Sequence, residues 1–132
     1  NPHGHWAEGR LADDDRGSVP ARCIAFARLG MVAFSYDMAG YVDSRQLTMN
    51  WGHSGGNLSA EERLRQHLWG IHPFGVQLLA SIRALDFMES LPYVDTARLG
   101  CTGASGGGTQ TFALAAVDDR VRYLTPVNMI SH

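Results

Sequence analysis

Apolar positions along the chain change between helical and strand-like spacing. Within residues 19–29 the apolar side chains recur at helical spacing, which predicts a helix that Ser18 caps and Gly30 ends. Residues 31–36 are a nearly continuous apolar run, which is typical of a short strand buried on both faces. Residues 1–17 show neither period and are expected to form a loop.

The same alternation continues through the rest of the chain. Ser59, followed three positions later by Glu62, forms the pattern of a capping box at the start of a short helix. Strands that alternate with helices favour a parallel sheet with helices on its faces. The elements expected after residue 58 are a helix over 59–68, a longer helix between Pro73 and Pro92, a strand over 97–102, a Gly-rich turn over 103–108, a helix over 109–117 and a strand over 121–127.

Composition narrows the function classes. The chain has 132 residues, of which 45% are hydrophobic and 18% charged, as in an ordinary globular domain. The formal net charge of −2 argues against a nucleic-acid partner, and all 11 basic residues are Arg, which excludes chemistry that needs Lys. No apolar run reaches the roughly 18–20 residues that cross a membrane, so no membrane partner is expected. Cys23 and Cys101 lie in apolar runs and are expected to be buried free thiols.

The Gly-rich turn carries the strongest chemical signal. It contains Gly103-x-Ser105-x-Gly107 between an expected strand and an expected helix, which is the context of a nucleophile elbow. Such a turn is so tight that the positions two residues either side of the serine must lack side chains. The strained backbone aims the Ser105 hydroxyl at the N-terminus of the following helix. There the Gly106 N–H and the helix dipole can stabilise an oxyanion.

Two other interpretations of this turn remain open. Residues 102–108 also resemble the phosphate turn of short-chain dehydrogenases, which would make the protein an NAD(P)-binding oxidoreductase. Against this, Ser105 occupies the position of the second glycine of G-x-G-x-x-G, and without Lys no Tyr-x-x-x-Lys pair can follow. The turn can also be a strand–helix connection without chemistry, in a non-catalytic hydrolase-like module.

A His-Gly-His-Trp motif at residues 3–6 is independent of the turn. A hydrolase elbow needs a second oxyanion donor from an earlier loop, and a His-Gly pair builds that donor in many esterases and lipases. The donor is assigned to the backbone N–H of His5, with that of Trp6 second. The alternative is a metal site in which His3 and His5 share a divalent ion with a carboxylate of the acidic run 13–15.

Taken together, the chain resembles the α/β-hydrolase superfamily and, within it, the bacterial acetylxylan esterase and dienelactone-hydrolase-like branch. The resemblance rests on residues 2–6, on Asp37-Met38-Ala39-Gly40-Tyr41 after a strand, and on residues 103–107. It implies a three-layer α/β/α sandwich with a mostly parallel sheet. It also implies a serine hydrolase for carboxylic esters, with acetylated carbohydrates as the suggested substrates and no metal or organic cofactor.

The resemblance assigns roles residue by residue. Ser105 matches the nucleophile, and Gly106 and His5 match the backbone donors of the oxyanion hole. Asp37 matches a turn that is usually structural in the family, although it can also lie near the site. The insertion over residues 41–72 follows a strand at the active-site edge of the sheet, so its aromatic and His side chains either line a substrate pocket or form a surface cluster. The residues expected at such a pocket are Trp6, Trp51, His53, His67 and Trp69.

The catalytic acid and base of the family do not match this chain. The family's order is Ser, then Asp or Glu, then His. After Ser105 the only carboxylates are Asp118 and Asp119, which we expect to face solvent, and the only histidine is His132. We therefore expect residues 1–132 to be the central part of a single α/β-hydrolase domain, an incomplete fragment whose acid and base follow His132.

The expected sheet order leads to the same interpretation. In the family, the strand that feeds the oxyanion loop lies between the strands that match residues 31–36 and 97–102. That strand would precede Asn1, so residues 31–36 are expected to lack a ladder partner. Such a chain on its own is expected to be marginally stable and inactive.

Overall fold

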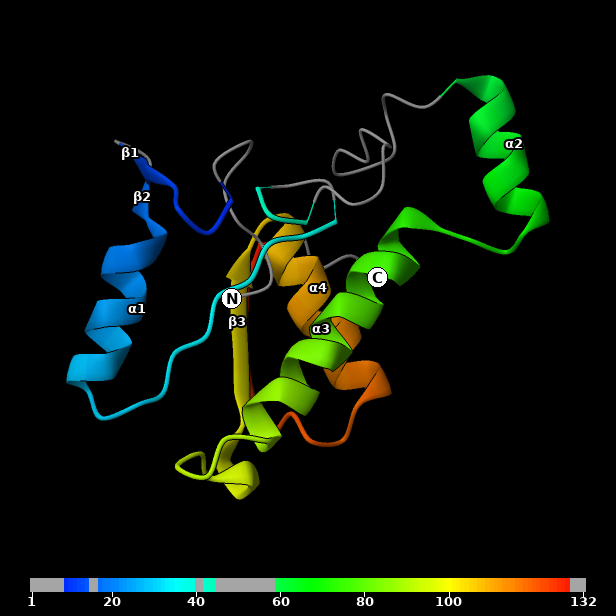
Figure 1. The fold of residues 1–132 in the computed structure, drawn as a ribbon. Helices are drawn as coiled ribbons and strands as arrows, with labels where there is room; N and C mark the ends of the chain where they lie inside the picture. Colours follow the sequence, from blue (N-terminus) through cyan, green and yellow to red (C-terminus); the bar gives the residue numbers. More distant parts are fainter. Residues whose placement is uncertain (1–8, 15–16, 40–41, 45–58, 129–132) are drawn as a thin grey trace.

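A computed structural model describes residues 9–14, 17–39, 42–44 and 59–128. Its elements alternate much as the pattern of apolar positions predicts (Figure 1). The elements are β1 (Asp13–Asp14), β2 (Gly17–Ser18), α1 (Val19–Arg28), α2 (Ala60–Leu68), α3 (Pro73–Glu89), a 3₁₀ turn (Thr96–Arg98), β3 (Gly100–Ala104), α4 (Gly106–Val117) and β4 (Tyr123–Val127).

The helix boundaries confirm the capping signals. The Ser18 hydroxyl accepts a hydrogen bond from the Ala21 N–H at 3.0 Å at the start of α1, and Gly30 follows the end of α1 with φ +81°. The Ser59 side chain and the Glu62 carboxylate form the expected capping box at the start of α2. One expectation is wrong: residues 13–18, expected mainly as loop, form the short antiparallel pair β1–β2.

Strands β3 and β4 form the parallel pair that the βαβ pattern predicts. Their register runs from Gly100 opposite Tyr123 to Ala104 opposite Val127, and α4 connects them. Strand β3 begins later than expected because residues 96–98 form a 3₁₀ turn, in which the Asp95 carboxylate accepts from the Ala97 N–H at 3.0 Å. Helix α4 begins earlier than expected, at Gly106.

Residues 31–36 are not a strand, which corrects the expectation of a third parallel strand. The segment runs beside α3 and forms no strand ladder within the described part of the chain. The ring centroids of Phe34 and of Phe87 on α3 are 4.9 Å apart. Met31 is 55% exposed and Val32 is 45% exposed. A strand needs a neighbour to pair its backbone groups, and no described segment lies beside this one as a strand. The described residues therefore show a two-stranded parallel sheet rather than a complete sandwich.

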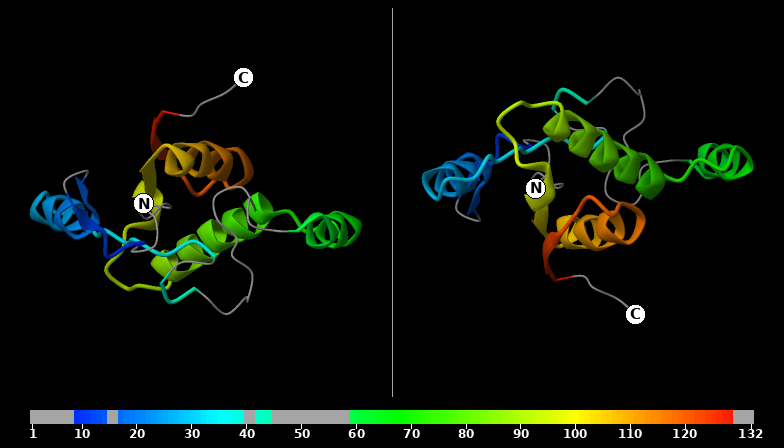
Figure 2. Two further views of the ribbon diagram at one scale, coloured as in Figure 1. Left: turned by 90° about the horizontal axis from the view of Figure 1, so that it is seen from above. Right: turned by 90° about the horizontal axis from the view of Figure 1, so that it is seen from below.

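The hydrophobic core lies where α3 and α4 pack side by side against β3. Figures 1 and 2 show these two helices adjacent, with α1 and α2 at opposite ends of the molecule. Apolar residues of the α3 stripe supply one side of this core, as its spacing predicts. The buried members are Leu85, Leu99, Leu114 and Val121, with Leu78, Ile82, Met88, Val94, Cys101 and Ala115 packed around them.

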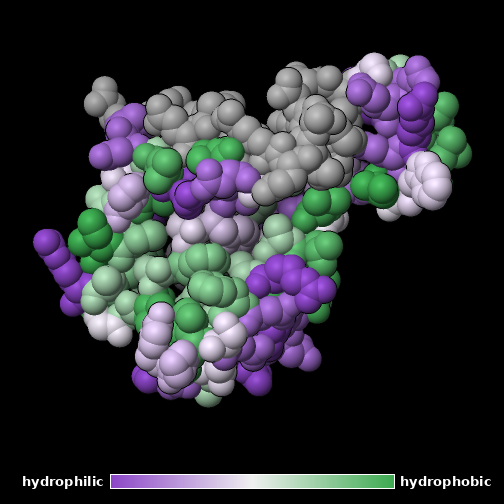
Figure 3. Space-filling model, viewed as in Figure 1, coloured by the Kyte–Doolittle hydropathy of each residue, from purple (hydrophilic) through white to green (hydrophobic). Residues whose placement is uncertain are grey.

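The outer surfaces differ in character. Figure 3 shows apolar residues gathered on the face of the molecule in this view, whereas α2 at the upper right presents largely hydrophilic residues. None of the described helices is long and apolar enough to cross a membrane. Cys23 and Cys101 are free thiols as expected, but each is only partly buried rather than fully buried.

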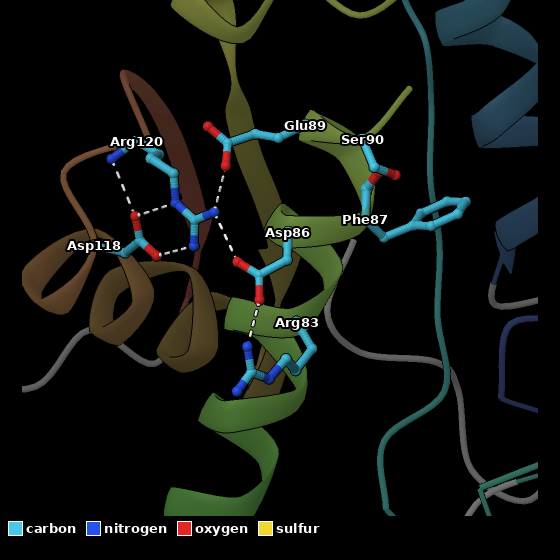
Figure 4. Close-up of polar contacts among 7 residues, drawn as sticks. All are labelled: Arg83, Asp86, Phe87, Glu89, Ser90, Asp118 and Arg120. Atoms are coloured by element: carbon cyan, nitrogen blue, oxygen red, sulfur yellow. Dashed lines mark hydrogen bonds and ion pairs between the residues drawn. The ribbon is translucent and has the colours of Figure 1, made fainter. Parts of the chain in front are cut away.

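An ion-pair network joins the C-terminal ends of α3 and α4 (Figure 4). The Arg120 guanidinium donates to Asp118 at 2.6 Å, to Asp86 at 2.8 Å and to Glu89 at 2.7 Å, and Arg83 also binds Asp86 at 2.7 Å. The expectation that Asp118 faces solvent is therefore wrong, because its side chain is only 11% exposed and is paired with Arg120. Nearby hydrogen bonds from Arg120 hold the pKa of the Asp118 carboxyl below its usual value.

Candidate active site

Ser105 lies at a sharp junction between β3 and α4. Its backbone angles are φ 56° and ψ −119°, a conformation that side-chain-bearing residues rarely adopt. Its N–H donates to the Val127 carbonyl at 2.8 Å, and its carbonyl accepts from the Thr109 N–H at 3.1 Å. The residue is exposed, and its side chain makes no capping bond to the helix it precedes. The fold thus holds Ser105 in a strained backbone conformation and leaves its hydroxyl exposed and unused as a helix cap.

Glycines make this junction sterically possible. A Cβ on Gly103 would lie 2.7 Å from both the backbone carbon and the backbone oxygen of Gly107, where an ordinary contact is 3.4–4 Å. A Cβ on Gly108 would lie 2.8 Å from the Val127 carbonyl oxygen at the end of β4. Gly103 and Gly107 are the pair that the sequence motif predicts, while Gly108 adds a close approach to the neighbouring strand.

The N-terminus of α4 provides the electrostatics of the site. Gly106 is the first residue of the helix, and the first turn carries no acidic residue. The early N–H groups of a helix lack intrahelical acceptors and carry about half a positive charge between them. Because the Ser105 side chain does not cap them, this end of α4 can accept developing negative charge near the Ser105 hydroxyl.

Asp37 is a buried anchor rather than a free carboxylate. Its side chain is 2% exposed, accepts from the Arg10 backbone N–H at 2.7 Å and forms an ion pair with the Arg10 guanidinium. The same guanidinium reaches Asp43 at 2.5 Å. Gly9, with φ +52°, lies so close to Asp37 that a side chain there would collide with the carboxylate. Asp37 therefore ties residues 9–10, which follow the His-Gly motif in sequence, to residues 37–44.

The other expected pocket residues do not gather at Ser105 within the described residues. Trp69 is 80% exposed at the C-terminal end of α2, and His67 is exposed on the same helix, which projects away from α3 and α4 in Figures 1 and 2. The remaining expected site residues, and the histidines of the alternative metal site, lie outside the described residues: His3, His5, Trp6, Trp51 and His53. No group of three metal-ligating side chains occurs in the part of the chain that is described.

No described residue completes a triad with Ser105. Asp118 lies beyond the far end of α4, about 20 Å along the helix axis from Ser105, and is held by Arg120. The described histidines are His67 on α2 and His72, whose Nδ1 accepts from the Phe74 N–H at 3.2 Å to cap α3. His132 lies outside the described residues.

A buried polar network between α3 and α4 was not expected from the sequence. The Gln110 Nε2 of α4 donates to the Gln77 Oε1 of α3 at 3.0 Å, and the Ser81 hydroxyl lies 3.4 Å from the Gln110 Oε1. Tyr36 donates to the Ser81 hydroxyl at 2.7 Å, and burial raises the pKa of Tyr36 well above its usual value. The sequence held only part of this signal: Gln77 and Ser81 lie four residues apart and so on one face of α3, but their partner Gln110 is distant in sequence.

The unit β3–Ser105–α4–β4 has the strand–elbow–helix geometry of the α/β-hydrolase class. A family model for acetyl xylan esterase (AXE1) matches residues 14–129, so the chain belongs to the acetyl xylan esterase family. This confirms the resemblance drawn from the motifs, and it implies the α/β-hydrolase fold and hydrolase activity on esters. None of the curated proteins and none of the solved structures matches the chain.

Proposed function

We propose that Ser105 is the nucleophile of a serine esterase that removes acetyl groups from carbohydrate. The observation that supports this most directly is the backbone of Ser105, with φ 56° and an exposed side chain at a strand–helix junction. Such a conformation costs about 1–3 kcal/mol and persists where a function requires it. Membership of the acetyl xylan esterase family supports an acetate ester of xylan as the substrate class.

The proposed reaction passes through an acyl-enzyme. The Ser105 Oγ attacks the ester carbonyl carbon while its proton passes to a general base. The bond between the carbonyl carbon and the alcohol oxygen then breaks, and the alcohol leaves with that proton. Water attacks the acetyl group on Ser105, releasing acetate and restoring the hydroxyl. No step of this cycle requires a metal or an organic cofactor.

The oxyanion hole is proposed to use two backbone donors. One donor is the N–H of Gly106, the first residue of α4, directly after Ser105. The other is the N–H of His5 in the His-Gly motif. Each such donor contributes roughly 2.7–4 kcal/mol to transition-state stabilisation. The Arg10–Asp37 pair supports the second assignment, because it anchors the chain five residues after His5.

The general base and its orienting acid are proposed to lie outside the described residues. The described carboxylates after Ser105 are at the far end of α4, and the described histidines belong to α2 and to the cap of α3. Residues 1–132 are thus proposed to be part of a single α/β-hydrolase domain, in which β3, Ser105 and α4 form the nucleophile-bearing unit.

Hydrolysis by the full-length protein tests this function. We expect turnover of p-nitrophenyl acetate and of acetylated xylan, and Ser105→Ala should reduce it by about 10⁴-fold or more. Ser90→Ala is the matched control, because Ser90 is an exposed serine whose hydroxyl donates to the Phe87 carbonyl of α3 at 2.7 Å. Unchanged turnover in Ser105→Ala would refute the proposal. Absence of turnover together with NAD(P) binding would favour the oxidoreductase, and absence of both would favour a non-catalytic module.

A further inference from the structure

We propose that Gln110 is a positioning residue for Ser105, an inference that rests on the proposed nucleophilic role of Ser105. Through its buried hydrogen bond to Gln77, Gln110 sets the rotation of α4 about its own axis. That rotation determines where the Ser105 hydroxyl and the Gly106 N–H point, because both lie at the N-terminal end of the same helix. Gln110 touches no reacting atom and acts only through the helix.

The contacts of Gln110 join two neighbouring helices. Its Nε2 donates to the Gln77 Oε1 at 3.0 Å, and its Oε1 lies 3.4 Å from the Ser81 hydroxyl, so both ends of the amide have a partner on α3. Ser81 also lies 3.2 Å from the carbonyl oxygen of Gln77 and accepts from Tyr36. The amide of Gln110 is thereby held in one orientation.

The three polar side chains of the network are buried, which packing alone does not explain. Gln110 is 2% exposed, Ser81 is 0% exposed and Gln77 is 6% exposed. Burying a polar group is unfavourable unless it is hydrogen-bonded, and an apolar side chain would fill the same space without this requirement. Apolar contacts such as that of Leu114 are non-directional, whereas hydrogen bonds require alignment. The network therefore restricts rotation of α4 in a way that the core does not.

Gln110 lies close to the elbow along the axis of α4. Gln110 lies five positions after Ser105, which is about 7.5 Å along the helix axis. The next residue, Thr111, is 0% exposed, donates to the Gly107 carbonyl at 2.8 Å and lies 3.4 Å from the Cys101 Sγ of β3. The first turns of α4 are thus fastened to α3 by Gln110 and to β3 by Thr111.

The network also reaches the segment that anchors Arg10. Tyr36 ends the hydrogen-bond chain that begins at Gln110, and its sequence neighbour Asp37 anchors Arg10. Arg10 follows the His-Gly motif closely in sequence. Residues 36–37 therefore join the polar network of α3 and α4 to the anchor of Arg10.

Two variants of the full-length protein test this inference. Gln110→Met keeps an unbranched side chain of similar length but removes the hydrogen bonds, and it should reduce kcat for p-nitrophenyl acetate about 10–100-fold with KM within about twofold. The double variant Gln77→Met/Gln110→Met removes both partners, so no amide is left unpaired and much of the lost stability should return. Its kcat should stay low, because the directional contact is still missing.

Leu114→Val is the matched control, a buried change on the same helix that leaves the network intact. It should lower Tm with kcat within about twofold of wild type. Amide hydrogen exchange in residues 106–109 provides a readout independent of activity and should accelerate in both Gln110 variants but not in Leu114→Val. Recovery of kcat along with stability in the double variant, or unchanged exchange in residues 106–109, would overturn the inference. Turnover that survives Ser105→Ala would instead refute the proposed function, with the exchange result still deciding whether Gln110 holds the elbow.

Discussion

Replacing Gly103 with Ala tests whether the elbow needs the contact between β3 and the first turn of α4. The new Cβ would lie 2.7 Å from the backbone carbon and oxygen of Gly107 and 2.9 Å from its Cα. Ordinary contacts are 3.4–4 Å, so the two backbone segments must separate by at least about 0.7 Å. None of these three atoms belongs to a flexible side chain, so the separation has to move the helix that follows Ser105.

The expected effect of Gly103→Ala falls on both stability and activity. Overpacking of this kind costs about 1–3 kcal/mol of unfolding free energy. A displacement approaching 1 Å at the nucleophile should reduce kcat by about 10²-fold. The assays are urea unfolding followed by circular dichroism and steady-state hydrolysis of p-nitrophenyl acetate by the full-length protein, each compared with wild type.

Gly75→Ala is the matched control for this substitution. Gly75 lies in α3, and a Cβ there would meet nothing within 4 Å. The variant should be more stable by about 0.4–1 kcal/mol, because Ala restricts the unfolded chain, and its kcat should not change. The reasoning is refuted if Gly103→Ala hydrolyses the ester at a rate close to that of Gly75→Ala.

Two further predictions concern strain and charge. Ser105→Gly should be more stable than Ser105→Ala by about 1–3 kcal/mol in urea unfolding, because Gly tolerates the combination of φ 56° and ψ −119°, whereas a residue with a Cβ is strained there. Both variants should be inactive, and equal stability would show that the elbow is unstrained. Arg120→Met should lower Tm at pH 7 and lower it less at pH 3, and an equal loss at both pH values would contradict the assigned role of Arg120. The pKa of Asp118 is lowered chiefly by Arg120, and that of Asp86 by Arg83 and then Arg120. The contribution of these two carboxylates to the stability of the fold is therefore present above the usual Asp pKa of 3.8 and is lost as pH falls through the lowered pKa values.

The helices could be predicted because their signals are local. Ser18 and Ser59 accept hydrogen bonds from the first turns of their own helices, and the motif around Ser105 specifies a turn whose glycines meet each other. Each of these signals depends on residues a few positions apart, so the sequence pattern contains the whole interaction. The family and the position of the elbow followed from the same kind of information.

Two features could not be predicted because they depend on partners distant in sequence: the conformation of residues 31–36 and the buried polar network. An apolar run forms a strand only where another strand pairs with it, and no described segment pairs with residues 31–36. Gln77 and Gln110 lie 33 residues apart, and each alone resembles an ordinary polar position on a helix. The Arg10–Asp37 pair and the contacts of Arg120 with Asp86 likewise join residues far apart in sequence, and local spacing does not specify them.

Mapping the covalent adduct of a fluorophosphonate probe on the full-length protein tests the central claim most directly. The probe phosphonylates an activated serine and leaves other serines unmodified. Peptide mass spectrometry should find one adduct, on Ser105, and none when acetylated xylan is present in excess. An adduct on another residue, or no adduct on a protein that hydrolyses acetate esters, would contradict the assignment of Ser105 as the nucleophile.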